Sequence, residues 1–204
     1  MPLTAEPEAH RLSLEALAQR PEEAVSLTFA LPFCAAHCLC CDRDILAAQP
    51  EEVIGDYVDG LIEETRQLAQ RLGTRREVLQ LHLGGGSASE LEEVQVSRLV
   101  HAVRDAWCLP ADAEMSIDCD PRRTGWMQMQ LLRSLGFTHV NFGVLDLDPR
   151  VQQAIGRRHS AALIDDVCEV ARSCDIEYVN LGLMIGLPHQ NPASWRDTLR
   201  RGMA

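Results

Sequence analysis

The feature that most constrains the fold of this chain is a regular alternation between short apolar segments and longer amphipathic ones. The five short segments, rich in β-branched and apolar residues, are residues 25–31, 78–83, 114–119, 138–144 and 177–185. Their length and composition are typical of buried strands. Strands that alternate with helices predict right-handed crossovers and a parallel sheet, either an open doubly wound one or a barrel.

The amphipathic segments predict helices at residues 51–72, about 89–107, 124–135, 160–174 and from 192 onward. Apolar residues recur in them at the spacing that lines one face of a helix. Ser89 and Glu92 form a capping-box pattern for the second of these helices. Asn191 followed by Pro192 predicts the N-cap and first turn of the last one. We therefore expect about five strand-helix units.

Every expected strand is followed by a polar or glycine-rich segment. These segments are residues 31–43, 84–86, 118–122, 143–148 and 186–189. In parallel α/β folds, ligands gather at the carboxyl ends of the strands. The order of elements therefore predicts that these five segments meet at one edge of the sheet and form a site there.

The first of these segments reads LPFCAAHCLCCDR and holds four of the eight cysteines. Cys34, Cys38 and Cys41 have the spacing C-x3-C-x2-C. Three thiolates from one loop can bind three irons of a four-iron cluster and leave the fourth iron open to a small molecule. A zinc ion with Cys40 or His37 as a fourth ligand is the alternative, as is a loop without metal.

The other four cysteines are scattered, and we expect them to be small core residues: Cys108, Cys119, Cys168 and Cys174. Clustered thiols in a chain without a secretory signal indicate metal or redox chemistry rather than disulfides. The first twenty residues are polar and acidic, and no apolar run approaches the roughly 20 residues of a membrane span. We therefore expect a cytoplasmic protein.

Charge and length limit the partners and the number of domains. A formal net charge of -11 removes the basic surface that nucleic-acid binding usually needs. The 204 residues suffice for one hydrophobic core. We expect residues 1–24 to be an N-terminal lead-in with a short helix at about residues 12–19, and residues 25–204 to form one domain.

Five motifs occur in the expected order along the chain: PFC-x3-C-x2-C, LHLGGGSAS, AEMSIDCDPR, FGVLDLDPRVQQAIGR and GLPHQNPASW. Through them the chain resembles the oxygen-independent coproporphyrinogen III oxidase family of radical S-adenosylmethionine (SAM) enzymes over roughly residues 25–204. The haem chaperones of that family share most of these motifs. The resemblance therefore indicates the superfamily more sharply than the individual member.

The resemblance implies a partial (β/α) barrel in which Cys34, Cys38 and Cys41 bind a [4Fe-4S] cluster. SAM would chelate the open iron, and one electron would split it to a 5′-deoxyadenosyl radical. In the oxidases that radical removes hydrogen from the propionate side chains of coproporphyrinogen III, which then lose carbon dioxide and become vinyl groups. A porphyrinogen is thus the implied substrate, and the electron donor is left open.

The resemblance also assigns residues to the cofactor. Gly85 and Gly86 would line the amino-acid part of SAM, with Ser87 beside them in the same turn. Asp118 occupies the acidic SAM-binding position of the family, and Arg157 occupies the position that binds the SAM carboxylate. The alternative for Arg157 is an ordinary exposed arginine at a helix end.

Several positions depart from the family pattern at the same edge. Thr28 and Ala30 replace a tyrosine and a histidine, Leu145 replaces a glutamine, and Gly182 replaces an aspartate; Asp118 is shorter than the usual glutamate. Leucine and glycine side chains cannot form the hydrogen bonds that a ribose hydroxyl needs. We therefore expect weaker SAM binding than in the family.

The chain ends in the fifth expected helix, whereas the family continues with another strand-helix unit and a C-terminal domain. The resemblance thus implies a truncated barrel without that domain. Three hypotheses follow: a radical SAM enzyme of porphyrin synthesis, a relative that binds a cluster or haem without oxidase activity, and a fragment that needs a partner to cover its open edge.

Overall fold

The computed structural model describes residues 8–73 and 75–203. Its main sheet has five parallel strands in the order β1-β4-β5-β6-β7. The strands are β1 (Val25–Leu31), β4 (Val78–Gly85), β5 (Glu114–Cys119), β6 (His139–Leu145) and β7 (Tyr178–Leu183). Along this sheet the strands follow one another in the same order as in the sequence. The order does not reverse at any point, as it would in a doubly wound sheet. The sheet is the wall of a partial (β/α) barrel, as expected.

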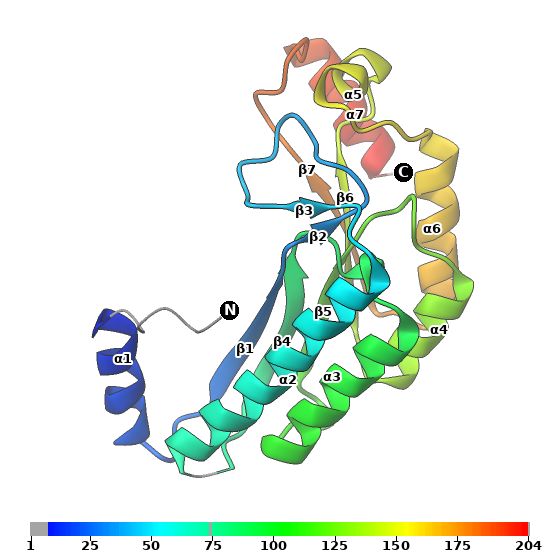
Figure 1. Ribbon diagram of the computed structural model, residues 1–204. Helices are drawn as coiled ribbons and strands as arrows, with labels where there is room; N and C mark the ends of the chain where they lie inside the picture. The colour runs from blue at the N-terminus through cyan, green and yellow to red at the C-terminus, as the bar shows by residue number, and fades with distance from the viewer. Residues whose placement is uncertain (1–7, 74, 204) are drawn as a thin grey trace.

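The helices that follow the first four strands lie along one face of this sheet (Figure 1). They are α2 (Glu51–Leu72), α3 (Glu93–Ala106), α4 (Trp126–Ser134) and α6 (Ala161–Ser173). The last helix, α7 (Pro192–Gly202), follows β7 and lies near the end of the molecule that carries α5 (Pro149–Ile155). The expected strand-helix units are therefore all present.

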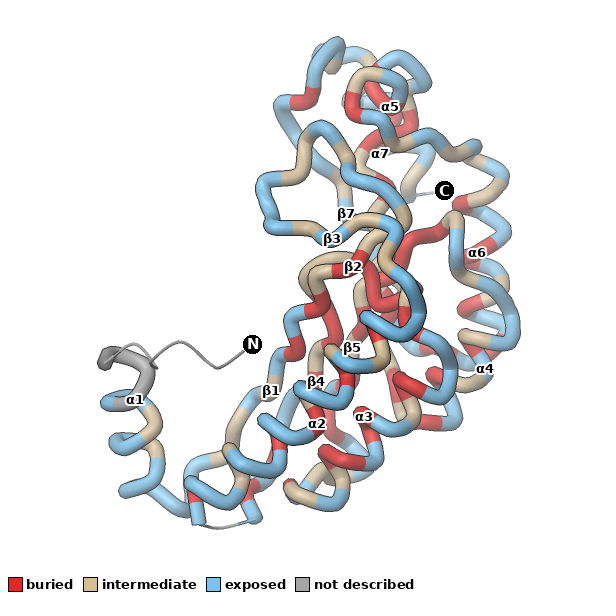
Figure 2. Tube along the Cα trace, in the orientation of Figure 1, coloured by how far each residue is buried: buried red, intermediate tan, exposed pale blue. Residues whose placement is uncertain are grey.

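The core lies between the sheet and these helices. In β6, Val140, Phe142 and Val144 are fully buried, whereas the alternate residues His139 and Asn141 are partly exposed. The same alternation, in β5 and in β4 from Gln80 to Leu83, places apolar side chains toward the helices and polar ones on the opposite, concave face. Figure 2 shows the buried positions concentrated where strands and helices meet.

Several local predictions differ from the structure. The capping box of α3 is formed by Glu92 and Gln95, not by Ser89 and Glu92, because Ser89 lies in a short 3-10 helix, η1 (Ala88–Glu90). Helix α5 was not expected, since its seven residues are too few for a clear helical period. Cys108 is exposed rather than buried, whereas the other three scattered cysteines are buried.

The N-terminal helix α1 (Glu8–Ala18) begins earlier than the expected residues 12–19; residues 1–7 of the lead-in lie outside the described residues. Buried Arg76 joins this segment to the body. Its guanidinium donates to the carbonyl oxygens of Leu17, Arg20 and Glu23 at 2.6–3.1 Å. Three backbone acceptors of this segment thus partner the buried charge.

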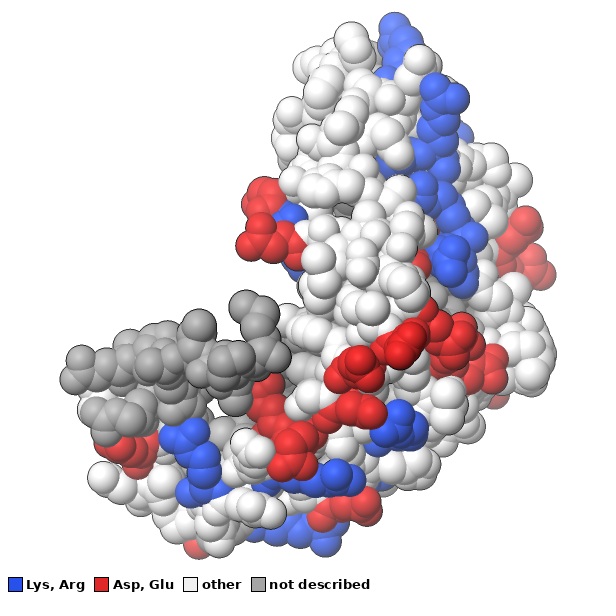
Figure 3. All heavy atoms as spheres, in the orientation of Figure 1, with Lys and Arg blue, Asp and Glu red and all other residues white. Residues whose placement is uncertain are grey.

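The surface is strongly acidic overall, but its charges are unevenly placed. In Figure 3 a band of acidic side chains crosses the middle of the face in view, and a stripe of basic ones lies on the side of α5 and α6. Since the chain contains no lysine, that stripe consists of arginine. Of the helices described, none combines the length and the apolar character needed to cross a bilayer.

Candidate functional site

The cysteine loop leaves the carboxyl end of β1 and is held at its base by a small parallel sheet. Strand β2 (Phe33–Cys34) pairs with β3 (Leu46–Ala47), and the Ala48 N–H donates to the Cys34 carbonyl at 2.9 Å. Near its tip, the Leu39 N–H donates to the Ile155 carbonyl at the end of α5, also at 2.9 Å. The loop is therefore fixed at two places, one of them on a helix that is distant in sequence.

The glycine run at the end of β4 packs against the backbone that leads into this loop. A Cβ on Gly86 would lie 2.3 Å from the Phe33 carbonyl oxygen and 2.8 Å from that of Leu31. The Gly86 N–H donates to the Leu31 carbonyl at 2.5 Å, and the Ser87 N–H donates to the Phe33 carbonyl at 2.8 Å. Gly85 has a φ of +106°, which favours glycine. The glycines thus allow close approach of the chain's own backbone.

A cavity of about 330 Å³ lies at the carboxyl ends of the strands. It is lined by all eight residues that the sequence suggested for cluster and cofactor: Cys34, Cys38, Cys41, Gly85, Gly86, Ser87, Asp118 and Arg157. These residues come from four separate segments of the chain. The fold therefore brings the cysteine loop, the glycine run, the end of β5 and the end of α5 together around one space of ligand size.

The thiols are half-buried in this cavity. Burial raises the pKa of the Cys34 thiol to about 11 and also raises that of Cys40. Since metals bind thiolates, loading the loop would release protons. In the described part of the chain, no three His, Cys, Asp or Glu side chains are close enough together to hold one metal ion. Cluster thiolates each bind a different iron and are spaced by the cluster, so this donor set fits a four-iron cluster in its chemistry.

Asp118 is oriented by side chains on the concave face of the sheet. Its Oδ1 accepts a hydrogen bond from Asn141 Nδ2 at 3.0 Å, and Asn141 in turn accepts one from Asn180 at 2.9 Å. His82 Nε2 lies 3.6 Å from the other carboxylate oxygen. A Cβ on Gly84 would lie 2.2 Å from that nitrogen and 2.8 Å from Asp118 Oδ2, so glycine leaves room for this pair.

The residue that sequence reasoning missed is Asp120, two positions after Asp118. It is 3% exposed and accepts hydrogen bonds from Arg122 at 2.5–3.2 Å, while its own N–H donates to the hydroxyls of Ser87 and Ser89 at 3.0 Å. Burial alone would raise its pKa, but Arg122 and Arg157 together lower it below the usual aspartate range. Asp120 stands in segment 118–122 and in the AEMSIDCDPR motif, but neither distinguished it from its neighbours.

Two departures from the family pattern also line the cavity. Leu145 ends β6 with a φ of +69° and packs in a small apolar cluster with Cys40 and Ile155. Gly182 of β7 presents only backbone to the cavity. Neither can donate or accept a side-chain hydrogen bond at the position where the family pattern has a polar group.

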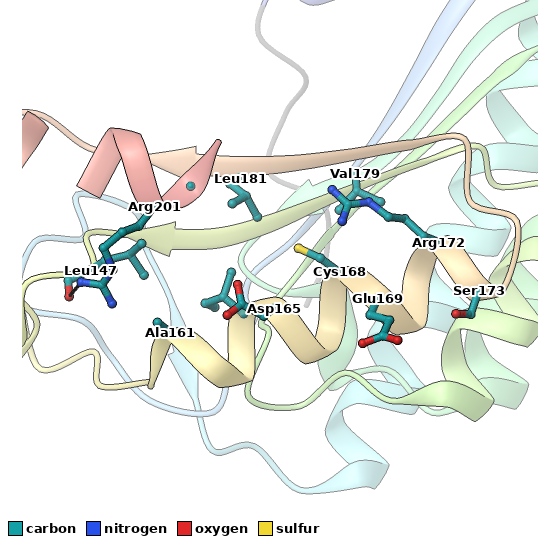
Figure 4. A pocket seen from close by; sticks show the side chains of 12 residues that line it. Leu147, Ala161, Asp165, Cys168, Glu169, Arg172, Ser173, Val179, Leu181 and Arg201 are labelled. Carbon is teal, nitrogen blue, oxygen red and sulfur yellow. Dashed lines mark hydrogen bonds between the residues drawn. The ribbon is translucent and has the colours of Figure 1, made fainter. Parts of the chain in front are cut away.

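A larger hollow of about 830 Å³ lies elsewhere, between α6, β7 and the end of α7. Figure 4 shows Cys168 of α6 on the side of this hollow that faces β7, Arg172 beside Val179, and Arg201 of α7 beside Leu147. None of the residues suggested for cluster or cofactor lines this hollow. Size alone therefore does not identify the site, and the convergence of motifs does.

Comparisons with known proteins agree with this arrangement. The sequence model described as the Radical SAM superfamily matches residues 29–202. The oxygen-independent coproporphyrinogen III oxidase of Synechocystis sp. is 34% identical over 177 residues, which are 87% of this chain and 38% of that protein. The protein of that name from Escherichia coli K12 is 35% identical over 188 residues, covering 92% and 41%.

Two solved structures have folds similar to that of this chain. Coproporphyrinogen III oxidase from Escherichia coli, described as a radical SAM enzyme, superposes with a TM-score of 0.87 at 34% identity, over 94% of this chain and 44% of that one. A radical SAM methyltransferase from Kitasatospora setae, with cobalamin and a [4Fe-4S] cluster bound, gives 0.54 at 15% identity, over 94% and 36%, and shows the fold alone. This chain spans about 40% of the length of the curated relatives named above. With the superfamily match extending over most of its length, the chain belongs to the radical SAM superfamily.

Proposed function

We propose that this chain binds a [4Fe-4S] cluster through Cys34, Cys38 and Cys41 and takes SAM into the adjoining cavity. The observation that carries the proposal is the meeting of these three thiols with Gly85 and Asp118 around one space of about 330 Å³. The cysteine, glycine and acidic segments are far apart in sequence, and the parallel sheet brings all of them to the carboxyl ends of its strands. Their convergence supports a common ligand.

The chain's own residues have distinct parts in this proposal. The loop between Cys34 and Leu46, fixed by β3 and by α5, holds the thiols in one orientation. Asn141 orients the Asp118 carboxylate, which lines the cavity and would accept hydrogen bonds from hydroxyl or ammonium groups of SAM. When bound, the cluster and SAM would supply one-electron cleavage chemistry, while the protein positions the groups and excludes water.

For the substrate, the names of the relatives support a porphyrinogen. The family resemblance adds the oxidative decarboxylation of its propionate side chains. A second candidate is a protein that binds a cluster or haem without that reaction. It is favoured by Leu145 and Gly182, which remove two side-chain hydrogen bonds from the cavity. Each such bond contributes about 1 kcal/mol, so their loss weakens SAM binding.

Anaerobic reconstitution with iron and sulfide separates these candidates. Iron and sulfide content, with absorption and electron paramagnetic resonance spectra, tests the cluster. Release of 5′-deoxyadenosine from SAM under a strong reductant tests the enzyme, and conversion of coproporphyrinogen III tests its substrate. A cluster without SAM cleavage leaves the second candidate. Protein that takes up no cluster contradicts the first candidate, and protein that also binds no added haem contradicts the second.

The ligand set has its own test. Cys34→Ala, Cys38→Ala and Cys41→Ala should each lose the reconstituted cluster, since each removes one of three iron ligands. Cys40→Ala is the matched control, because Cys40 belongs to the same loop but packs with the apolar cluster around Ile155. It should retain wild-type iron content. A ligand variant that keeps a full cluster contradicts the assignment.

A further inference from the structure

Arg157 lies between the cysteine loop and the end of β6. Its Nε donates to the Gly143 carbonyl at 2.9 Å, and its Nη1 donates to Cys38 Sγ at 3.6 Å. The side chain is 11% exposed. Gly143 permits this approach, because a Cβ there would lie 3.3 Å from Nη2 of the arginine. The fold itself therefore places the guanidinium against the Cys38 thiol.

Asp120 holds this guanidinium in place. Its Oδ2 lies 3.4 Å from Arg157 Nη1, the same nitrogen that contacts Cys38. The carboxylate is itself fixed by two parallel hydrogen bonds from Arg122 and is almost fully buried. One buried carboxylate thus sits between two arginines, and the three groups carry a net charge of about +1 next to the cysteine loop.

We infer that Arg157, positioned by Asp120, donates a hydrogen bond to the cluster ligand Cys38 and raises the reduction potential of a cluster bound on this loop. The inference rests on the proposed function, since it requires the cluster. It goes beyond a role in binding the SAM carboxylate, because Nε and Nη1 are committed to Gly143 and Cys38 within the fold. Among the described residues, Nη2 has no hydrogen-bond partner and is left for a ligand.

The physical reason is the change of charge on reduction. A cluster that accepts an electron becomes more negative, and its thiolate sulfurs become better hydrogen-bond acceptors. A fixed N–H···S bond and a positive charge beside one sulfur both stabilise the reduced form, because hydrogen bonds and net charge set cluster potentials. The effect is large where the groups are shielded from water, as this arginine is.

The test is a redox titration of the reconstituted full chain without SAM, followed by electron paramagnetic resonance of the reduced cluster. Arg157→Gln should lower the equilibrium constant for reduction at least about tenfold, which is about 59 mV for one electron. Arg158→Gln is the control: it makes the same change in net charge one residue along, at an exposed position. Its potential should match the wild type.

Two further variants separate charge from position. Arg157→Lys keeps the charge but cannot reproduce the geometry of the guanidinium, so the cluster potential of this variant should lie below the wild-type value. If Arg157→Gln retains no iron, Arg157→Lys replaces it in the comparison with Arg158→Gln. Asp120→Asn removes the group that orients Arg157. In that background the shift caused by Arg157→Gln should shrink by at least half.

The outcomes are distinct. A wild-type protein that binds no cluster contradicts the proposed function, and the inference with it. A wild-type cluster whose potential is the same in the Arg157→Gln and Arg158→Gln variants contradicts the inference alone. Equal shifts from Arg157→Gln with and without Asp120→Asn would show that Asp120 is not the positioning residue.

Discussion

At the scale of single residues, Gly84 and Gly86 at the end of β4 each leave space for a different neighbour. The missing side chain of Gly84 leaves space for His82 and Asp118, whereas that of Gly86 leaves space for the Phe33 carbonyl oxygen. That carbonyl also accepts the Ser87 N–H. A side chain at Gly86 would therefore push on backbone that leads directly into Cys34.

Gly86→Ala should destabilise the protein by roughly 1–3 kcal/mol, the usual cost of overpacking, because backbone rather than a flexible side chain would have to move. Urea unfolding of the apo-protein measures this change. Gly60→Ala is the control, since nothing lies within 4 Å of its Cβ position in α2. It should stabilise by about 0.5–1 kcal/mol. Equal stability of the two variants would contradict the assigned packing role of Gly86.

At the scale of elements, the ends of β6 and β7 determine how well the cavity can hold a polar ligand. The register of the pair shifts between Gly143 and Leu145, and Leu145 adopts a left-handed backbone. Gly182 lies opposite Gly143 in this pair, on the exposed side of β7. The two strand ends thus carry few side-chain polar groups toward the cavity.

Gly182→Asp should tighten SAM binding about fivefold, the effect of one added hydrogen bond of about 1 kcal/mol. The new Cβ would lie 3.6 Å from the Phe142 carbonyl oxygen, an ordinary contact, so the strand should accept it. Equilibrium binding to the reconstituted protein measures the change. Gly182→Ala adds the Cβ without oxygens and should not tighten binding. Equal affinities of the two variants would mean that this position does not contact SAM.

At the scale of the whole molecule, the sheet has two edges, and β7 forms one of them. Its exposure alternates along the strand, and its helix-facing side borders the hollow beside α6. Unpaired strand edges offer a row of free backbone groups to another chain. The hypothesis of a fragment that needs a partner predicts that another chain covers this edge in solution.

Hydrogen exchange along β7 tests this edge. The Tyr178 N–H pairs with Thr138 and the Met184 N–H pairs with Leu145, so alternate amides face β6. The Leu181 amide should face outward and exchange rapidly, whereas amides of the central strand β5 should exchange slowly. Repeating the measurement at lower protein concentrations controls for self-association. Slow exchange at Leu181 at all concentrations would show that the edge is covered in solution.

Local patterns were enough to predict most of the elements. The structure reproduces the expected bounds of Val25–Leu31, Glu51–Leu72 and Glu114–Cys119, because each has its own period and clear stop signals. The grouping of the site segments at one edge followed from the order of strands and helices. The seven residues of α5 and the cap of α3 escaped prediction, since short helices and competing caps are settled by their neighbours.

The strand-helix alternation, the spacing of Cys34, Cys38 and Cys41 and the motifs that carry the family resemblance can all be read from the amino-acid sequence, because each depends on residues near one another in the chain. The contact in which Asp120 holds Arg157 against the cysteine loop becomes visible only in the folded chain. The same is true of the backbone that Gly86 approaches. These contacts join segments that lie tens of residues apart, and their geometry depends on how the strands pair and how the loops pack. No local pattern carries that information.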